Sequence, residues 1–251
     1  MTVTIATTIP LENNNSDNDV SPCQPVIEIH RWQNQAQVEQ NTNFRFQLAG
    51  TGSATFNGES LTLKLDTTSE EGYMTARIHE IDLSLSGQER EQQKCWDPTK
   101  GVKVNYRIKW SKALFSPTLT ENAYLVNAPE SISDPWTVVG IARSPLTQSY
   151  SIIVAQKVVP TPDGLDGYFS VTPLTQIDPT EWHEVTLRVV DNQADVIVKQ
   201  GDTVVKIRRE APNSFEKLGM AFSIDNEGLP GQIAPPSDSQ LQIDYFSARL
   251  L

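Results

Sequence analysis

The sequence predicts an all-β protein, a sandwich or a barrel, and three observations lead to that prediction. Apolar and polar residues alternate with period two through many short segments. Clusters of Gly, Pro, Asn and Asp separate these segments, and convincing amphipathic helices are scarce. The chain has 251 residues, of which 38% are hydrophobic, so it can bury one sizeable core.

The N-terminal segment differs from the rest of the chain. Residues Leu11–Pro25 are polar and rich in Asn, Asp, Ser and Pro, so they bury too little apolar surface to offset the entropy of ordering. We therefore expect a mobile tail over residues 1–25 and a single domain over 26–251. The N-terminus lacks the basic and apolar segments of a secretory signal, and no run is long enough to span a membrane, so a cytoplasmic location is expected.

The clearest strands lie in the second half of the chain. Residues Val102–Trp110 alternate between an apolar and a polar face, as a half-buried strand does. His183–Val190, Ala194–Gln200 and Thr203–Arg209 are separated by short turns and predict a three-strand meander. The segment Ser86–Trp96 contains helix-favouring residues but no apolar stripe, so it fits a long loop as well as a short helix.

Charge and cysteine content exclude several classes of partner. The formal net charge is −11 and the sequence pI is about 4.7, so the surface repels nucleic acid and anionic membranes. Cys23 and Cys95 are far apart, and with three histidines they form no zinc-ligand spacing. Whether the two cysteines pair stays open.

The stretch Asp178–Arg209 resembles the hairpin pair of concanavalin A-like sandwiches, a superfamily that includes legume lectins, laminarinase-like glucanases and laminin-G modules. Trp182 and His183 open a strand there, and Gly201 lies in the second turn. The ending Leu241–Leu251 looks like the last strand of that superfamily. The resemblance covers residues 101–251, and the preceding strands more weakly. It implies an antiparallel jelly-roll β-sandwich and leaves the function open.

The glucanases of this superfamily carry Glu-x-Asp-x-x-Glu, or a form one residue shorter, on a catalytic strand that follows an aromatic strand. By chain order, Glu121–Ala128 takes the place of the aromatic strand and Trp136–Ser144 that of the catalytic strand. The second segment contains no carboxylate. Because a retaining glucanase needs two carboxyl groups about 5 Å apart, glucanase chemistry is not expected from this strand.

A second acidic motif occurs earlier, at "HEIDLS". Glu80 and Asp82 are weak candidates for hydrolase carboxylates, and His79 beside them is a weak candidate for a general base. The motif lies roughly a hundred residues ahead of the His-bearing strand, too early for the catalytic strand of the superfamily. The favoured interpretation places Glu80 and Asp82 on a solvated strand face and directs Ile81, Leu83 and Leu85 to the core. His183 falls in the apolar register of its strand, which predicts a hydrogen-bonded core histidine.

A ligand groove is expected over three consecutive strands between residues 121 and 157. One of their faces combines apolar residues in the middle with polar residues at the ends, which suits a shallow groove. The candidate ligand-binding residues are Glu121, Asn127, Trp136, Arg143 and Lys157. In the alternative interpretation, Arg143 and Glu121 form an exposed ion pair and Trp136 belongs to the core.

Two acidic loops offer oxygen ligands for calcium, a metal that is common in the superfamily. Their candidate ligands are Asp163 and Asp166 in one loop, and Asp225 and Glu227 in the other. Neither loop matches an EF-hand, and Asp-Gly pairs are ordinary turn formers. Calcium is therefore a weak expectation.

Three functions are compatible with these observations. The first is a β-sandwich that binds a glycan or a small organic molecule on its concave face, without glucanase chemistry. The second is a non-hydrolytic enzyme of small-molecule biosynthesis, such as a cyclase or isomerase. The third is a glycoside hydrolase that uses Glu80 and Asp82. The sequence leaves the ligand, the occurrence of turnover and the oligomeric state open.

Overall fold

The computed structural model describes several stretches of the chain, and the strands within them form two antiparallel sheets. The described residues are 26–66, 74–80, 96–110, 119–126, 136–143, 150–157, 169–190, 193–210, 219–226 and 238–251. The tail over residues 1–25, Cys23, Cys95 and the segment 86–95 lie outside them. The boundary between tail and domain therefore stays a prediction.

Sheet A has eight described strands. They are β1 (Val26–Ile29), β3 (Ser53–Phe56), β4 (Leu61–Asp66), β6 (Val102–Trp110), β11 (His183–Val190), β12 (Gln193–Gln200), β13 (Thr203–Glu210) and β15 (Asp238–Leu250). Their order is β13-β12-β11-β6-β15-β4-β3, with β1 paired to β15.

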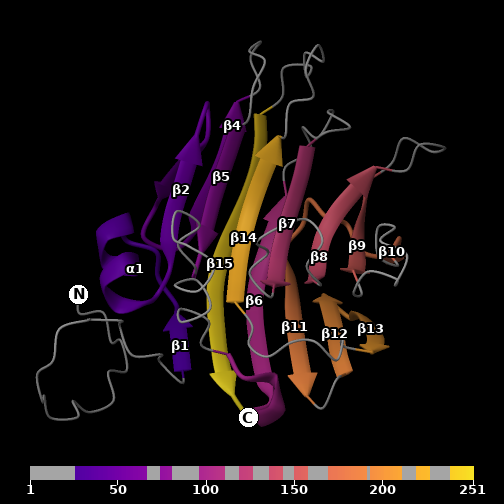
Figure 1. Ribbon diagram of the computed structural model, residues 1–251. Helices are drawn as coiled ribbons and strands as arrows, with labels where there is room; N and C mark the ends of the chain where they lie inside the picture. The colour runs from indigo at the N-terminus through magenta and orange to yellow at the C-terminus, as the bar shows by residue number, and fades with distance from the viewer. Residues whose placement is uncertain are drawn as a thin grey trace, which may run out of the picture.

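Sheet B has seven described strands. They are β2 (Arg45–Ala49), β5 (Met74–His79), β7 (Leu119–Val126), β8 (Trp136–Arg143), β9 (Tyr150–Lys157), β10 (Phe169–Leu174) and β14 (Gly219–Asn226). Their order is β10-β9-β8-β7-β14-β5-β2. Figure 1 shows the two sheets lying one over the other, and this arrangement confirms the predicted antiparallel jelly-roll sandwich.

The predicted strands of sheet A are confirmed. The five apolar side chains of β6 are each 3% exposed or less, and polar residues alternate with them. β11, β12 and β13 pair in sequence order as the expected meander. Gly201 lies in its second turn with a φ of 55°, a backbone conformation that favours glycine.

The short helix α1 (Gln35–Asn41) falls outside the sequence predictions. Asn34 caps its N-terminus, because the Asn34 side-chain oxygen accepts a hydrogen bond from the backbone N–H of Gln37 at 2.9 Å. Val38 is its one buried residue, so the helix lacks an apolar stripe that a sequence could reveal. A 3-10 turn, η1 (Pro98–Lys100), precedes β6. Among the described residues, no helix has the length and apolar composition needed to cross a membrane.

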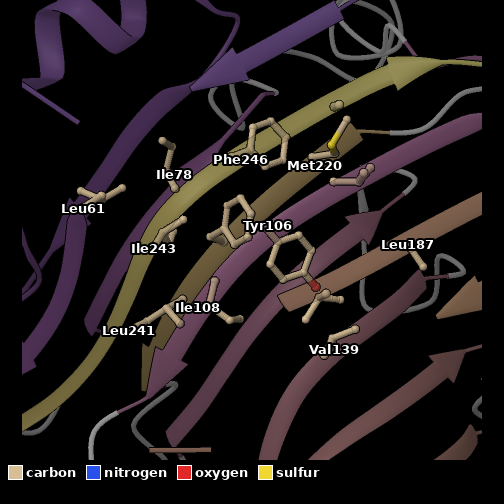
Figure 2. Packing of buried hydrophobic residues seen from close by; sticks show 14 of the residues in the cluster. Leu61, Ile78, Tyr106, Ile108, Val139, Leu187, Met220, Leu241, Ile243 and Phe246 are labelled. Carbon is tan, nitrogen blue, oxygen red and sulfur yellow. The ribbon is translucent and has the colours of Figure 1, made fainter. Parts of the chain in front are cut away.

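The core lies between the two sheets, as Figure 2 shows for side chains from both of them. A chain of aromatic contacts connects the sheets. Phe222 of β14 packs edge-to-face on Tyr106 of β6 at 5.2 Å and on Phe246 of β15 at 5.5 Å between ring centroids. Phe246 also contacts Phe44 at 5.2 Å. Such pairs add about 0.5–1.5 kcal/mol each to the free energy of burial.

His183 is a core residue, as its register predicts. Its side chain is 1% exposed and stacks on Trp110 of β6, with ring centroids 5.1 Å apart. The Nδ1 atom lies 2.9 Å from the backbone oxygen of Glu181. Burial lowers the pKa of His183 to about 4, so the ring is neutral at neutral pH.

Replacement of Phe222 by alanine should destabilise the fold strongly. The change removes both aromatic contacts between the sheets, and we expect the free energy of unfolding to fall by about 3–5 kcal/mol. Chemical denaturation measures this. Val204→Ala, at a side chain 49% exposed on β13, is the control and should change stability by less than about 0.5 kcal/mol. Equal losses of stability in the two variants would contradict the role of Phe222 in joining the two sheets.

Candidate functional site

The strand pairing of sheet B does not place the predicted groove residues on one face. Val139 of β8 is 1% exposed and pairs with Ala123 of β7 and Val154 of β9, and paired residues share a face. The face of Val139 is therefore the core face. Glu121 and Arg143 occupy register positions on this core face, which corrects the predicted groove.

The error has a physical cause. Both faces of these strands are apolar in the middle, so period two alone does not tell which face packs on the core. Trp136 and Lys157 are register partners on the opposite, outward face. Asn127 lies outside the described residues, and a ligand-binding role for each of the five residues stays a prediction.

The outward face of sheet B carries a row of polar residues that crosses four adjacent strands. Gln47 of β2 pairs with Arg77 of β5, Arg77 with Ser223 of β14, and Ser223 with Asn122 of β7. We call these four residues the polar row. With about 4.8 Å between neighbouring strands, the row spans roughly 14 Å. Ile78, between Arg77 and His79, faces the core (Figure 2). Because side chains alternate along a strand, Arg77 and His79 take outward positions on β5.

The polar row contains buried polar atoms that the rest of the described chain leaves unsatisfied. Ser223 is completely buried, and its hydroxyl has no hydrogen-bond partner among the described residues. The Oε1 atom of Gln47 is also buried and has no hydrogen-bond partner among the described residues. Buried polar atoms are normally bonded, and each unmade hydrogen bond costs about 1–3 kcal/mol.

The outward face of sheet A differs because its polar side chains satisfy one another. A guanidinium nitrogen of Arg107 lies 2.6 Å from the carboxylate of Asp244. The Thr186 hydroxyl donates to Asn105 at 2.9 Å, and Asn105 donates to Ser247 at 3.3 Å. This network makes the face of sheet A a poorer candidate than the polar row.

Trp182 is also engaged on the face of sheet A. The guanidinium carbon of Arg107 lies 5.1 Å from its ring centroid, and the Lys109 ammonium nitrogen lies 4.9 Å from it. These cation–π contacts are worth roughly 0.5–1 kcal/mol each at exposed sites. They indicate that Trp182 anchors the two cations of β6 on the sheet surface.

A second row lies beside the polar row on sheet B. His79 pairs with Arg45 of β2 and Ala221 of β14, so it occupies an outward position two residues from Arg77. His79 is 7% exposed, and both His79 and Arg77 interact with other residues of the chain. The predicted base candidate therefore lies next to the polar row, enclosed rather than in open solvent.

Glu80 is buried in the sandwich interior, which corrects the prediction of a solvated carboxylate. Its side chain is 4% exposed, and both carboxylate oxygens accept from the Trp96 indole N–H at 2.9 and 2.8 Å. One of them also accepts from the backbone N–H of Met220 at 2.9 Å. The backbone N–H of Glu80 donates in turn to the Met220 oxygen at 3.0 Å. Glu80 thus ties the end of β5 to β14 and to the segment at Trp96.

The earlier residues of β5 explain why Glu80 points inward. Ala76 and Ile78 are core residues, and Glu80 is the next position of the same parity. The predicted inward residues Ile81, Leu83 and Leu85 lie outside the described residues. Burial raises the pKa of Glu80 to about 7, while the hydrogen bonds from Trp96 and Met220 act in the opposite direction.

The described residues do not assemble a hydrolase site. Glu80 is enclosed by Trp96 and Met220, and Asp82 lies outside the described residues. Asp225 is the one carboxylate at an outward register position of the described strands of sheet B. A glycoside hydrolase needs two carboxyl groups that flank the scissile bond.

The calcium candidates are not brought together in the described part of the molecule. Asp163, Asp166 and Glu227 lie outside it, and Asp225 occupies an outward position near the end of β14. Among the described residues, no three His, Cys, Asp or Glu side chains gather in a way that could hold a metal ion. Calcium therefore stays a prediction.

Comparison with known proteins agrees with the fold. No protein-family profile matches the chain, and no curated protein sequence matches it. The chain is similar in structure to a legume lectin-like domain from Entamoeba histolytica, with a TM-score of 0.53, 6% identity, and coverage of 88% of this chain and 96% of that one.

Two further solved structures are similar to the same extent. A GH16 protein of the Bacteroides ovatus mixed-linkage glucan locus, in complex with a G4G4G3G product, has a TM-score of 0.53 and 11% identity, with 82% and 94% of the two chains covered. The exoplasmic/lumenal domain of VIP36, in its Ca2+/Man3GlcNAc-bound form, has a TM-score of 0.53 and 11% identity, with 88% of each chain covered. The chain therefore has the concanavalin A-like jelly-roll fold that the resemblance implies.

The buried carboxyl of Glu80 should make stability fall as pH rises. Glu80 keeps its proton up to about pH 7 in the folded state but loses it near pH 4.5 in the unfolded state. Its contribution is therefore fully present below pH 4.5 and is lost between about pH 4.5 and 7. A shift of this size corresponds to about 3 kcal/mol. Denaturation curves of the wild type and Glu80→Gln across this range measure the difference.

The comparison with Glu80→Gln is needed because His183 titrates in the opposite sense. A histidine whose pKa is lowered to about 4 loses stability as pH falls from 6.5, and this would mask the contribution of Glu80. Relative to the wild type, Glu80→Gln should gain stability as pH rises from 4.5 to 7. A difference that is constant with pH would show that Glu80 titrates normally.

Proposed function

We propose that the protein binds carbohydrate on the outward face of sheet B, at the polar row, without cleaving glycosidic bonds. The observation that carries this proposal is a pair of buried polar atoms in the row, the hydroxyl of Ser223 and the Oε1 of Gln47, for which the described part of the chain supplies no hydrogen-bond partner. Saccharides present many hydroxyl groups, each of which both donates and accepts. They therefore suit a row that holds a hydroxyl and an amide oxygen on either side of Arg77.

The similar structures support a carbohydrate ligand. They are a legume lectin-like domain, a GH16 protein in complex with a glucan product and a lumenal domain in complex with a mannose-containing glycan. The outward positions also include Trp136, and aromatic rings are common contacts of bound ligands. The absence of any carboxylate on β8 and the enclosure of Glu80 favour binding over hydrolysis.

A non-hydrolytic enzyme of small-molecule biosynthesis is the second candidate. The low exposure of His79 and Ser223 favours it, because an enclosed polar site can hold a reactive substrate away from water. Incubation with candidate substrates and analysis for isomerised or cyclised products separates this function from binding alone. The cytoplasmic location also stays a prediction, which cell fractionation tests.

Substitution of a polar-row residue should weaken binding of the glycans that the protein recognises on a glycan array. Gln47→Ala removes one hydrogen-bonding group, so we expect the affinity to fall about threefold to tenfold in calorimetry. Gln242→Ala is the matched control, because Gln242 is also half-buried but lies on the outward face of sheet A. Equal losses in the two variants, or no binding to any glycan, would contradict the proposed site.

A further inference from the structure

We infer that the saccharide bound at the polar row is acidic, bearing carboxylate or sulfate groups. This inference rests on the proposed function and specifies its ligand class. The chain as a whole carries a net charge of −11, yet the outward positions of the described strands of sheet B have the opposite balance. Their permanently charged residues are Arg45, Arg77, Lys157 and Asp225, which are three cations and one anion.

The two arginines are close neighbours on the sheet. Arg45 pairs with His79, and Arg77 lies two residues before His79, so the arginines occupy diagonal positions roughly 7–8 Å apart at their backbones. The outward positions directly opposite the two arginines hold Gln47, His79 and Ser223, and Asp225 of β14 lies diagonal to Arg77 at the same spacing as Arg45. One carboxylate therefore stands against the two guanidinium groups. Two like charges at this spacing raise the local positive potential, and an anion between them lowers the energy of both.

The nearest carboxylate on helix α1 is already engaged. The Oε1 atom of Glu39 accepts from the Gln35 side chain at 2.9 Å and from the backbone N–H of Phe46 at 3.4 Å. The Arg45 guanidinium donates to the backbone oxygens of Glu39 and Phe44, which fixes its position at the edge of the sheet while its charge is retained. The edge of sheet B therefore presents an ordered cation.

Arg77 lies in the middle of the polar row, between Gln47 and Ser223, and its side chain is half-buried. It already interacts with another residue of the chain, so a ligand would add to that interaction. A guanidinium presents its N–H groups in a planar fork that matches a carboxylate or sulfate better than it matches a neutral hydroxyl. Partial burial strengthens this preference, because charge-assisted hydrogen bonds gain from a lower local dielectric.

Gln47 shows why the ligand is a sugar acid rather than a simple anion. The unsatisfied atom of Gln47 is an acceptor, the Oε1 oxygen, and it would repel the oxygen of a bare anion. It accepts readily from a hydroxyl group. The polar row thus combines a cation, an acceptor and a hydroxyl, which together match a molecule that carries both negative charge and hydroxyl donors.

The experiment measures binding of the full chain to two panels of oligosaccharides. The acidic panel contains oligogalacturonates, their methyl esters as uncharged counterparts, oligomannuronates and sulfated galactans. The neutral panel contains cello-, xylo- and manno-oligosaccharides. We expect binding to acidic members, loss of binding on methyl esterification, and weaker binding at high salt. The carboxylate and sulfate arms distinguish the two sources of charge.

Variants connect the charge preference to the site. Arg77→Gln should weaken binding of the acidic oligosaccharide about tenfold to a hundredfold, since it removes charge-assisted hydrogen bonds. Arg188→Gln removes the same charge from an exposed position on sheet A and should leave the affinity unchanged. If Arg77→Gln does not fold, Arg45→Gln at the exposed strand edge should still weaken binding and reduce its salt dependence.

The possible outcomes are distinct. Binding of neutral oligosaccharides as tightly as acidic ones would overturn the inference and leave the proposed function intact. Binding of no oligosaccharide in either panel would overturn both. Equal losses in Arg77→Gln and Arg188→Gln would show that the charge preference belongs to the surface as a whole rather than to the polar row.

Discussion

The register of β14 is the constraint on which the rest of the structure depends. Phe222 packs between Tyr106 and Phe246 of the opposite sheet, and this contact fixes which face of β14 is inward. Because side chains alternate along a strand, Ser223 must then face outward, although it is small and completely buried. The central position of the candidate site is thus determined by a packing contact on the other side of the same backbone.

The core and the candidate site are also connected through β5. Arg77 and His79 take outward positions, while Ile78 and Glu80 take inward ones. The carboxylate of Glu80 holds the end of β5 to β14 through the backbone of Met220. A buried carboxylate is costly unless it is well bonded, and here three N–H···O contacts offset part of that cost. These bonds keep Arg77 opposite Ser223. The buried Glu80 therefore helps to align residues of the outward face.

Residue patterns predict sheet A well and the site poorly. The strict alternation of Val102–Trp110 predicts β6, and the turns around Gly201 predict the meander. The predicted groove combined residues from both faces of sheet B, because β7, β8 and β9 are apolar on both sides. The polar row could not be found from the sequence, since Gln47, Arg77, Ser223 and Asn122 are brought together only by pairing between distant segments. Glu80 could have been placed from the spacing of Ala76 and Ile78.

The polar row takes one residue from each of four strands. A substitution can therefore change its chemistry and keep the fold, whereas an insertion or deletion within a strand disrupts both. A deletion of one residue in β5 would exchange the places of Arg77 and Ile78, so the site would lose its cation while the core received it. Loops between the strands carry no such restriction. Evolutionary divergence of ligand preference on this scaffold should therefore appear as point changes at alternate strand positions, with length variation confined to the connections.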